Sequence, residues 1–308
     1  MRRFGLVFLL LLGAAAAQDD PAPTRQSDVI YGRKHGVALT MDIFRPRKGA
    51  DGSAIVFVVS SGWHSGKRMV RPRWYRPLVR RGHTVFAVVH GSQPKYTLPE
   101  MVLDIRRAVR YIRHHAETLG IDPNRIGIMG ASAGGHLSLL LATDAKSGSG
   151  GDPVDGVSSR VQAVAAFYPP TDFLNWGAEG INVMKLPVQT RFKAPFDFRS
   201  FDKETGVYVR ITDPAQRDKL LEDLSPAHHI TPDDPPTLLI HGDRDLLVPL
   251  QQSRRMVALL EKAGVPAKLI VKEGAAHGGW RGLEKDLDVI ADWFAQRLAK
   301  KKPAPAGK

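Results

Sequence analysis

The sequence predicts an α/β protein in which helices cover both faces of a doubly wound, mostly parallel sheet. Apolar runs such as Ala54–Val59 alternate with helical periodicity, as expected of strands that are buried on both faces. Another apolar run, at residues 125–129, leads through Gly-Ala-Ser-Ala-Gly at 130–134 directly into a helical pattern. Two segments nearer the N-terminus alternate polar and apolar residues instead, which predicts an antiparallel hairpin at one edge of the sheet.

The remaining elements follow in a regular order. The hairpin is expected at residues 29–31 and 37–44, and it ends before Pro46. Strands and helices then alternate, a pattern that right-handed crossovers turn into a parallel sheet. We expect further strands at residues 54–59, 84–89, 125–129, 162–168, 237–241 and 267–272. We expect helices at residues 69–81, 99–119, 133–143, 249–263 and 283–299.

Two stretches depart from this order. Residues 144–160 are rich in Gly, Ser and Asp, which indicates a surface loop. Residues 171–214 form a long insertion with several aromatic side chains, which either cover a cleft as a lid or pack into a small core of their own. The sequence leaves both alternatives open, and we assign residues 28–299 to one domain.

The N-terminus has the parts of a secretory signal peptide at residues 1–17. Arg2 and Arg3 precede an apolar run over residues 4–12, and residues 15–17 are alanines suited to cleavage. The run is shorter than the about 20 residues that a membrane-spanning helix needs. We therefore expect a secreted or periplasmic protein without stable membrane insertion after cleavage. A polar leader is expected at residues 18–27 and a disordered basic tail at 300–308.

Composition excludes several classes of function. The chain of 308 residues is 43% hydrophobic, enough for a substantial core, and it has no cysteine for catalysis or disulfides. Its net charge of +13 falls to about +7 without the signal and the tail. No aromatic and basic groove pattern points to nucleic acid, and no histidine spacing points to a metal, so neither these partners nor a cofactor is expected. The oligomeric state is not indicated.

Ser132 lies at the centre of the Gly-x-Ser-x-Gly motif. A sharp turn from strand to helix holds such a serine with its hydroxyl exposed, which makes Ser132 the candidate nucleophile. The alternative is a serine that only caps the helix between glycines that only turn the chain. The strand before the motif and the helix after it favour the nucleophile. A serine hydroxyl needs an imidazole to take its proton and a carboxylate to orient that imidazole.

These two partners should follow Ser132 in the order acid, then histidine, in loops at the carboxyl ends of strands. Asp245 lies in the loop after the strand at 237–241 and is the candidate acid. Asp243 competes with it, but Asp243 follows the strand directly and more plausibly bonds loop amides. His277 lies in the glycine-rich loop after the last strand and is the candidate base. Alternatively, both aspartates only organise their turn.

Acyl transfer also needs hydrogen-bond donors for the oxyanion of the tetrahedral intermediate. The Ala133 amide, directly after the nucleophile, is one candidate donor. The loop after the strand at 54–59 should supply the others, and we expect the amides of Ser61 and Gly62 there. Trp63 then forms a wall of the acyl pocket. The alternative is a plain turn with a tryptophan in the core.

With these residues assigned, the chain resembles serine esterases of the α/β-hydrolase fold from about residue 29 to residue 298. It is most similar to bacterial carbohydrate esterases that act on acetyl and feruloyl esters, and to the catalytic domain of prolyl oligopeptidases. The similarity rests on residues 61–66, on the serine motif, on Ser225-Pro226, on His-Gly-Asp-x-Asp-x-x-Val-Pro at 241–249 and on His277. It implies that Asp245 and His277 complete the triad. Related enzymes often read His-Gly-Gly-Gly-Trp where this chain has Val-Ser-Ser-Gly-Trp at 59–63.

The expected function is that of a secreted serine hydrolase that cleaves carboxylic esters through an acyl-enzyme on Ser132. The substrates are small-molecule or carbohydrate esters, with acetyl or feruloyl groups as candidate acyl parts. One alternative is a secreted serine peptidase of the prolyl-oligopeptidase type. Another is a noncatalytic binding protein on a hydrolase scaffold, because a fold does not dictate its function.

Overall fold

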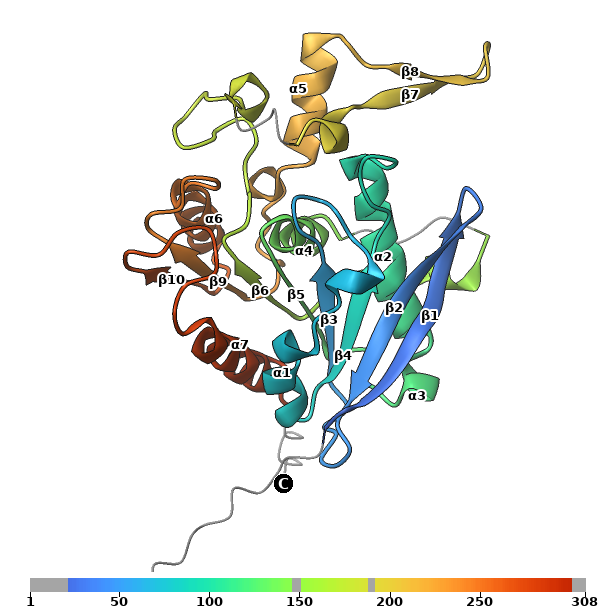
Figure 1. Ribbon diagram of the computed structural model, residues 1–308, viewed down its shortest axis with the longest axis vertical. Helices are drawn as coiled ribbons and strands as arrows, with labels where there is room; N and C mark the ends of the chain where they lie inside the picture. The colour runs from blue at the N-terminus through green and yellow to red at the C-terminus, as the bar shows by residue number, and fades with distance from the viewer. Residues whose placement is uncertain (1–21, 146–150, 188–191, 301–308) are drawn as a thin grey trace, which may run out of the picture.

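A computed structural model describes residues 22–145, 151–187 and 192–300 of the chain. Its centre is an eight-stranded sheet in the order β1-β2-β4-β3-β5-β6-β9-β10 (Figure 1). Strand β2 pairs antiparallel with β1 and β4, and the other neighbours are parallel. The strands are β1 (Thr24–Lys34), β2 (Val37–Arg45), β3 (Ala54–Val59), β4 (Thr84–Val89), β5 (Ile126–Ala131), β6 (Ala163–Phe167), β9 (Thr237–Gly242) and β10 (Ala267–Lys272). The predicted doubly wound sheet with its N-terminal hairpin is therefore confirmed.

Helices cover both faces of this sheet. The helices are α1 (Arg76–Arg80), α2 (Leu98–His114), α3 (Ala116–Leu119), α4 (Ala133–Thr143), α5 (Pro214–Asp223), α6 (Gln251–Lys262) and α7 (Leu283–Arg297). Apolar side chains of α2, α4 and α6 share one core cluster with Val56 and Val58 of β3. Those of α1 and α7 share the other cluster with Ile55, Phe57 and Val59, because successive side chains of a strand point to opposite faces.

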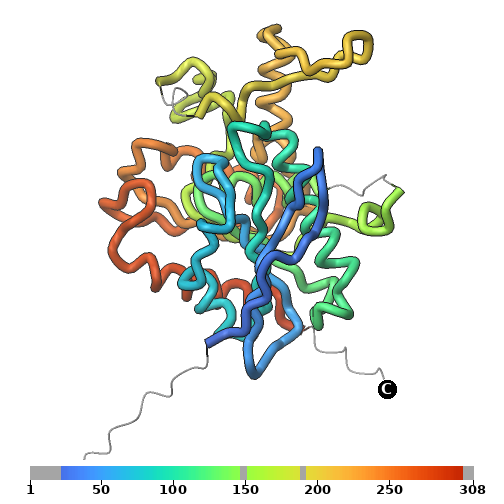
Figure 2. Tube along the Cα trace, turned by 45° about the vertical axis from the view of Figure 1, so that its right-hand side comes forward, coloured from blue at the N-terminus to red at the C-terminus, as the bar shows by residue number. Residues whose placement is uncertain are grey.

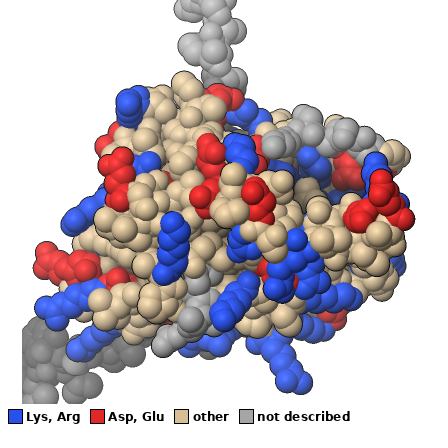
Figure 3. Space-filling model, turned by 90° about the horizontal axis from the view of Figure 1, so that it is seen from above, with Lys and Arg blue, Asp and Glu red and all other residues tan. Residues whose placement is uncertain are grey.

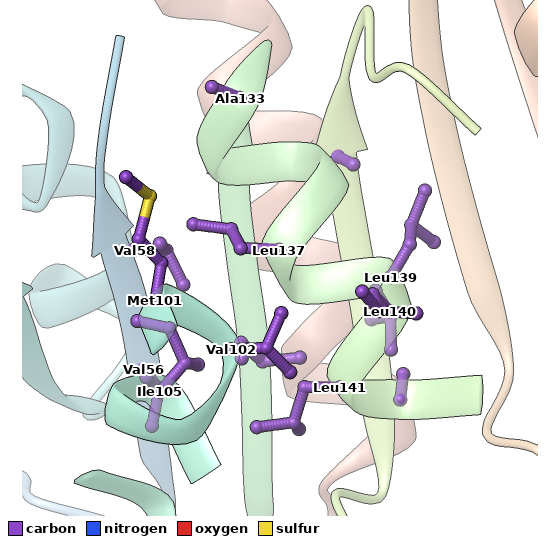
Figure 4. Packing of buried hydrophobic residues seen from close by; sticks show 14 of the residues in the cluster. Val56, Val58, Met101, Val102, Ile105, Ala133, Leu137, Leu139, Leu140 and Leu141 are labelled. Carbon is purple, nitrogen blue, oxygen red and sulfur yellow. The ribbon is translucent and has the colours of Figure 1, made fainter. Parts of the chain in front are cut away.

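Helix α4 directly follows Ser132 and lies in the core of the protein. All of its residues are buried, as expected of a helix that is apolar on every side. Figure 4 shows Leu137 and Leu141 on the side of α4 that faces β3 and α2, whereas Leu139 and Leu140 lie on the other side. Each buried leucine stabilises the fold by about 1.5–3 kcal/mol. This packing fixes the N-terminus of α4, and with it Ser132, relative to β5.

The predicted boundaries need three corrections. Strand β1 begins at Thr24, so residues 24–27 of the predicted leader pair with β2. The helix predicted at 69–81 consists of 3-10 turns at Lys67–Met69 and Pro72–Trp74 followed by the short α1. Proline lacks an N–H donor, and Pro72 and Pro77 each stand at a helix start rather than inside a continuous helix. The helix predicted at 99–119 is divided at His115 into α2 and α3.

The long insertion between β6 and β9 carries elements that the sequence did not reveal. Strands β7 (Arg199–Asp202) and β8 (Val207–Arg210) form an antiparallel hairpin, and α5 follows them. Figures 1 and 2 show the hairpin and α5 projecting beyond the carboxyl ends of the sheet strands. The predicted signal peptide lies outside the described residues, as do residues 18–21 of the leader and most of the basic tail. Among the described helices, none combines the length and apolar character that crossing a membrane requires.

Candidate active site

Ser132 connects the end of β5 to the start of α4 in a strained backbone conformation. Its φ of 53° and ψ of −119° are rarely adopted by residues other than glycine, and such strain costs about 1–3 kcal/mol. A Cβ atom at position 130 would lie 2.4 Å from the carbonyl carbon of Gly134, and one at position 134 would lie 2.6 Å from the Val58 oxygen. Neither position has room for a side chain, so the motif glycines are needed for the turn itself.

The structure brings the three predicted triad residues together. His277 Nε2 lies 2.9 Å from Ser132 Oγ, and His277 Nδ1 lies 2.6 Å from Asp245 Oδ2. The residues come from the loops after β10, β5 and β9, parallel strands whose carboxyl ends meet at one edge of the sheet. In this geometry the serine hydroxyl donates to the imidazole, and the other imidazole nitrogen donates to the carboxylate.

The Asp245 carboxylate is fixed on both oxygens. Its Oδ1 accepts hydrogen bonds from the backbone amides of Leu247 and Val248 at 2.9 and 2.8 Å. Burial raises the pKa of Asp245, but hydrogen bonds from His241 and His277 outweigh burial and hold the pKa well below its usual range. The carboxylate is therefore ionised at neutral pH and can stabilise an imidazolium. Asp243 instead accepts from the Gly274 amide at 2.7 Å, the loop role that was predicted for it.

Two aromatic side chains that the sequence analysis did not assign also orient this triad. His241 is fully buried, and its Nε2 lies 2.9 Å from the Val248 carbonyl and 3.2 Å from Asp245 Oδ2. Tyr168 follows β6 and contacts the His277 ring edge to face, with centroids 4.5 Å apart. Burial, assisted by the charge of Asp245, raises the pKa of Tyr168 to about 12, so its phenol stays neutral. His241 could have been noticed in the sequence, because it is the first residue of the His-Gly-Asp motif.

The candidate oxyanion donors lie in two places. Ala133 is the first residue of α4, so its N–H has no acceptor within the helix. Ser61 to His64 form a two-residue hairpin in which the Ser61 amide donates to the His64 carbonyl at 3.0 Å and the reverse bond is 2.9 Å. The Ser61 N–H is already engaged, so the structure does not support Ser61 as a donor. Gly62, at the tip with a φ of 53°, remains a candidate.

Residues from the loop after β4 hold this turn in place. The Gln93 side chain donates to the Gly62 carbonyl, and the Gln93 amide donates to the Trp63 carbonyl at 3.3 Å. Trp63 is buried among aromatic rings, and its indole N–H lies 3.4 Å from His136 Nδ1. His136 Nε2 lies 2.7 Å from the Leu224 carbonyl. His136 therefore links the turn, α4 and the segment that follows the insertion.

Two cavities of different size adjoin Ser132. The smaller has a volume of about 20 Å³ and is enclosed mostly by apolar side chains, among them Trp63, Phe173, Trp176 and Phe192. We call it the acyl recess. The larger has a volume of about 490 Å³, and His277 lines it together with Ser132. We call it the open cleft. Trp63 thus lines a cavity beside the nucleophile, as predicted, and the insertion aromatics pack around it.

The comparison with known families is consistent with this geometry. Residues 41–260 match the model of the family named BD-FAE, which is more than half of the chain. The chain belongs to the BD-FAE family. Among curated relatives, the probable carboxylic ester hydrolase LipM of Mycobacterium tuberculosis is 30% identical over 292 residues, which cover 91% of this chain and 64% of LipM. The chain thus spans somewhat less than two thirds of the length of that relative.

Solved structures similar to this BD-FAE member are also esterases. A truncated carbohydrate esterase from gut microbiota superposes with a TM-score of 0.73 at 26% identity, covering 92% of this chain and 99% of that one. An acetyl ester-xyloside bifunctional hydrolase from Caldicellulosiruptor lactoaceticus gives a TM-score of 0.69 at 26% identity, with coverages of 88% and 96%. These similarities place the chain in the α/β-hydrolase fold, beside proteins that are named as ester hydrolases. Over the described ranges, no cluster of three or more His, Asp or Glu side chains has the arrangement of a metal site.

Proposed function

We propose that this chain hydrolyses carboxylic esters through an acyl-enzyme on Ser132. The observation that carries the proposal is the hydrogen-bonded series from Ser132 Oγ through His277 to Asp245, with distances of 2.9 and 2.6 Å. Its BD-FAE relatives and structural neighbours, named as ester hydrolases and carbohydrate esterases, support the same reaction class. Small-molecule or carbohydrate esters are the proposed substrates.

The reaction follows from these contacts. Ser132 Oγ attacks the ester carbonyl while its proton moves to His277 Nε2, and the carbonyl oxygen becomes an oxyanion. The amides of Ala133 and Gly62 stabilise this oxyanion, and each such donor contributes about 3 kcal/mol in known hydrolases. The imidazolium, stabilised by Asp245, then protonates the departing alkoxide as the C–O bond breaks. A water molecule activated by His277 attacks the acyl-enzyme and releases the acid.

The two cavities indicate where the acyl part and the alcohol part of the ester bind. The leaving oxygen must lie near His277 because this imidazole protonates it, and His277 lines the open cleft but not the acyl recess. The alcohol part therefore belongs in the open cleft and the acyl group in the recess. A volume of about 20 Å³ accepts a group the size of one water molecule, which suits the methyl of an acetyl group. We therefore favour acetyl over feruloyl esters as substrates.

We further propose that the protein acts outside the cytoplasm, as a secreted or periplasmic enzyme. The support for this proposal is the sequence pattern of residues 1–17. The absence of cysteine makes the fold independent of the redox state of that compartment.

The reaction is tested by replacing the nucleophile. Ser132→Ala is expected to reduce turnover of p-nitrophenyl acetate by about 10⁴-fold or more while the protein stays folded. Because Ser132 has a strained backbone, the circular dichroism spectrum and the melting temperature of the variant must be measured beside wild type. Undiminished turnover in a folded Ser132→Ala variant would refute the mechanism. Faster release of an amine from a peptide anilide than of an alcohol from an ester would favour the peptidase alternative.

A further inference from the structure

Among the described residues that line the open cleft, one side chain is formally charged. It belongs to Arg71, whereas the other lining residues are aromatic, aliphatic, small and polar, or histidine. Within the described part of the chain, no Asp or Glu side chain lines this cleft. The Arg71 backbone is held by the adjoining 3-10 turn, in which its carbonyl accepts from the Trp74 amide at 3.0 Å. This bond fixes the Arg71 backbone at the wall of the cleft that should hold the alcohol part of the ester.

The segment that carries Arg71 is rich in basic residues. Residues 67–81 read Lys-Arg-Met-Val-Arg-Pro-Arg-Trp-Tyr-Arg-Pro-Leu-Val-Arg-Arg and contain no acidic residue. Lys67 forms an ion pair with Asp28, and Arg81 pairs with two aspartates of α7. By contrast, four exposed arginines of the segment form no ion pair with a described acidic side chain. They are Arg68, Arg71, Arg73 and Arg76.

The wider surface shows the same imbalance. Seen from the carboxyl ends of the strands, Lys and Arg side chains are more frequent than Asp and Glu over the lower part of the face (Figure 3). A cleft wall that carries one sign of charge concentrates ligands of the opposite sign. A guanidinium also offers paired N–H donors that match the two oxygens of a carboxylate. These features favour an anionic ligand beside Arg71.

We propose that Arg71 binds a carboxylate on the alcohol part of the substrate, so that the enzyme prefers esters of acidic alcohols. Among carbohydrates, this class is the O-acetylated uronic acids and the chains that contain them. The inference rests on the proposed function, because it uses the assignment of the alcohol part to the open cleft. Arg71 is thereby a specificity-determining residue and takes no part in proton transfer.

A pair of acetyl esters that differ only in charge tests this inference. 4-Acetoxybenzoate carries a carboxylate on its leaving group, and 4-acetoxybenzamide is a neutral substrate of nearly the same shape. Arg71→Gln is expected to lower kcat/KM for the benzoate, relative to that for the benzamide, by about tenfold because one charge-assisted hydrogen bond is lost. Arg71→Lys should retain part of the preference. In wild type the preference should decrease as salt screens the charges.

Arg73→Gln provides the matched control. Arg73 is two residues away, equally basic and exposed, but it does not line the open cleft. Its substitution should change the benzoate to benzamide ratio by less than about twofold, the range of an exposed charge interaction. An equal ratio in wild type and Arg71→Gln would overturn the inference, as would an equal loss in both variants. If folded wild type hydrolyses neither ester, the proposed function itself fails.

Discussion

At the scale of single residues, local geometry decides what could be predicted. Ser132 could be assigned from sequence because its turn excludes side chains at positions 130 and 134. Asp245 and His277 followed from their loops after β9 and β10. The oxyanion donors could not be resolved in the same way. Whether Ser61 or Gly62 offers its amide depends on hydrogen bonds to His64 that the residue types do not reveal.

Phe192 limits the acyl recess on the side of the insertion. Its ring is so close to Gly62 that a Cβ there would lie 2.6 Å from it, and it lines both cavities at Ser132. Phe192→Ala should therefore open the recess to longer acyl chains. We expect kcat/KM for p-nitrophenyl butyrate, relative to the acetate, to rise about tenfold, since each methylene in a hydrophobic pocket changes binding by about 1–3 kcal/mol.

Phe201→Ala is the control for this substitution. Phe201 lies on the exposed β7–β8 hairpin and is 53% accessible, so its removal should leave the acyl preference unchanged. A butyrate to acetate ratio that stays constant in Phe192→Ala would show that the recess does not select the acyl group.

At the scale of elements, the buried carboxylate of Asp172 helps to attach the insertion to the core. Asp172 is fully buried and accepts hydrogen bonds from Asn175 Nδ2 at 2.9 Å and Arg255 Nε of α6 at 2.8 Å. His228 Nε2 lies 3.2 Å from the same carboxylate. Burial raises the pKa of Asp172, but the hydrogen bonds, first that from His228, lower it to about 2. The hydrogen bond to Asp172 in turn raises the pKa of His228.

The two shifts define a pH window for this ion pair. The contribution of Asp172 is complete above its unfolded pKa of about 3.9 and is lost as the pH falls towards 2. The contribution of His228 is complete below its unfolded pKa of about 6.5 and is lost as the pH rises through its raised folded value. The pair should therefore stabilise the fold most between about pH 4 and about pH 6.5.

His228→Gln is predicted to lower the melting temperature more at about pH 5.5 than at about pH 9, because the imidazolium of wild type exists only at the lower pH. Thermal unfolding followed by circular dichroism measures both differences. His229→Gln is the control, since His229 bonds to the Asp223 backbone carbonyl at 2.9 Å rather than to a carboxylate. A loss of stability in His228→Gln that is the same at both pH values would contradict this account.

The elements that were not predicted from the sequence, β7, β8 and α5, are largely exposed to solvent. Strand β8 is exposed at every residue, β7 is exposed except for the half-buried Asp202, and α5 buries only Leu221. Short segments of this kind lack the apolar periodicity that reveals sheet strands and amphipathic helices. The aromatic residues of the insertion could be noticed in sequence, but their packing around Trp63 depends on contacts between distant parts of the chain.

At the scale of the whole molecule, the mostly parallel sheet could be predicted from features visible in the sequence. Strands β3 and β9 are fully buried, so each appears as a continuous apolar run. Helices α1 and α7 lie on one face of the sheet, and α2, α4 and α6 lie on the other (Figure 1). The loops after β5, β9 and β10 therefore meet at one edge of the sheet, where the triad forms.

The central claim, that Ser132 is the nucleophile of an acyl-transfer site, is tested most directly by covalent labelling. A fluorophosphonate reacts with an activated serine hydroxyl and expels fluoride, so the labelled chain gains one phosphonyl group. We predict one such group per folded chain, located by mass spectrometry on the peptide that contains Ser132. The triad predicts slower labelling in His277→Ala. Labelling confined to another residue, or no labelling of a protein that hydrolyses p-nitrophenyl acetate, would contradict the claim.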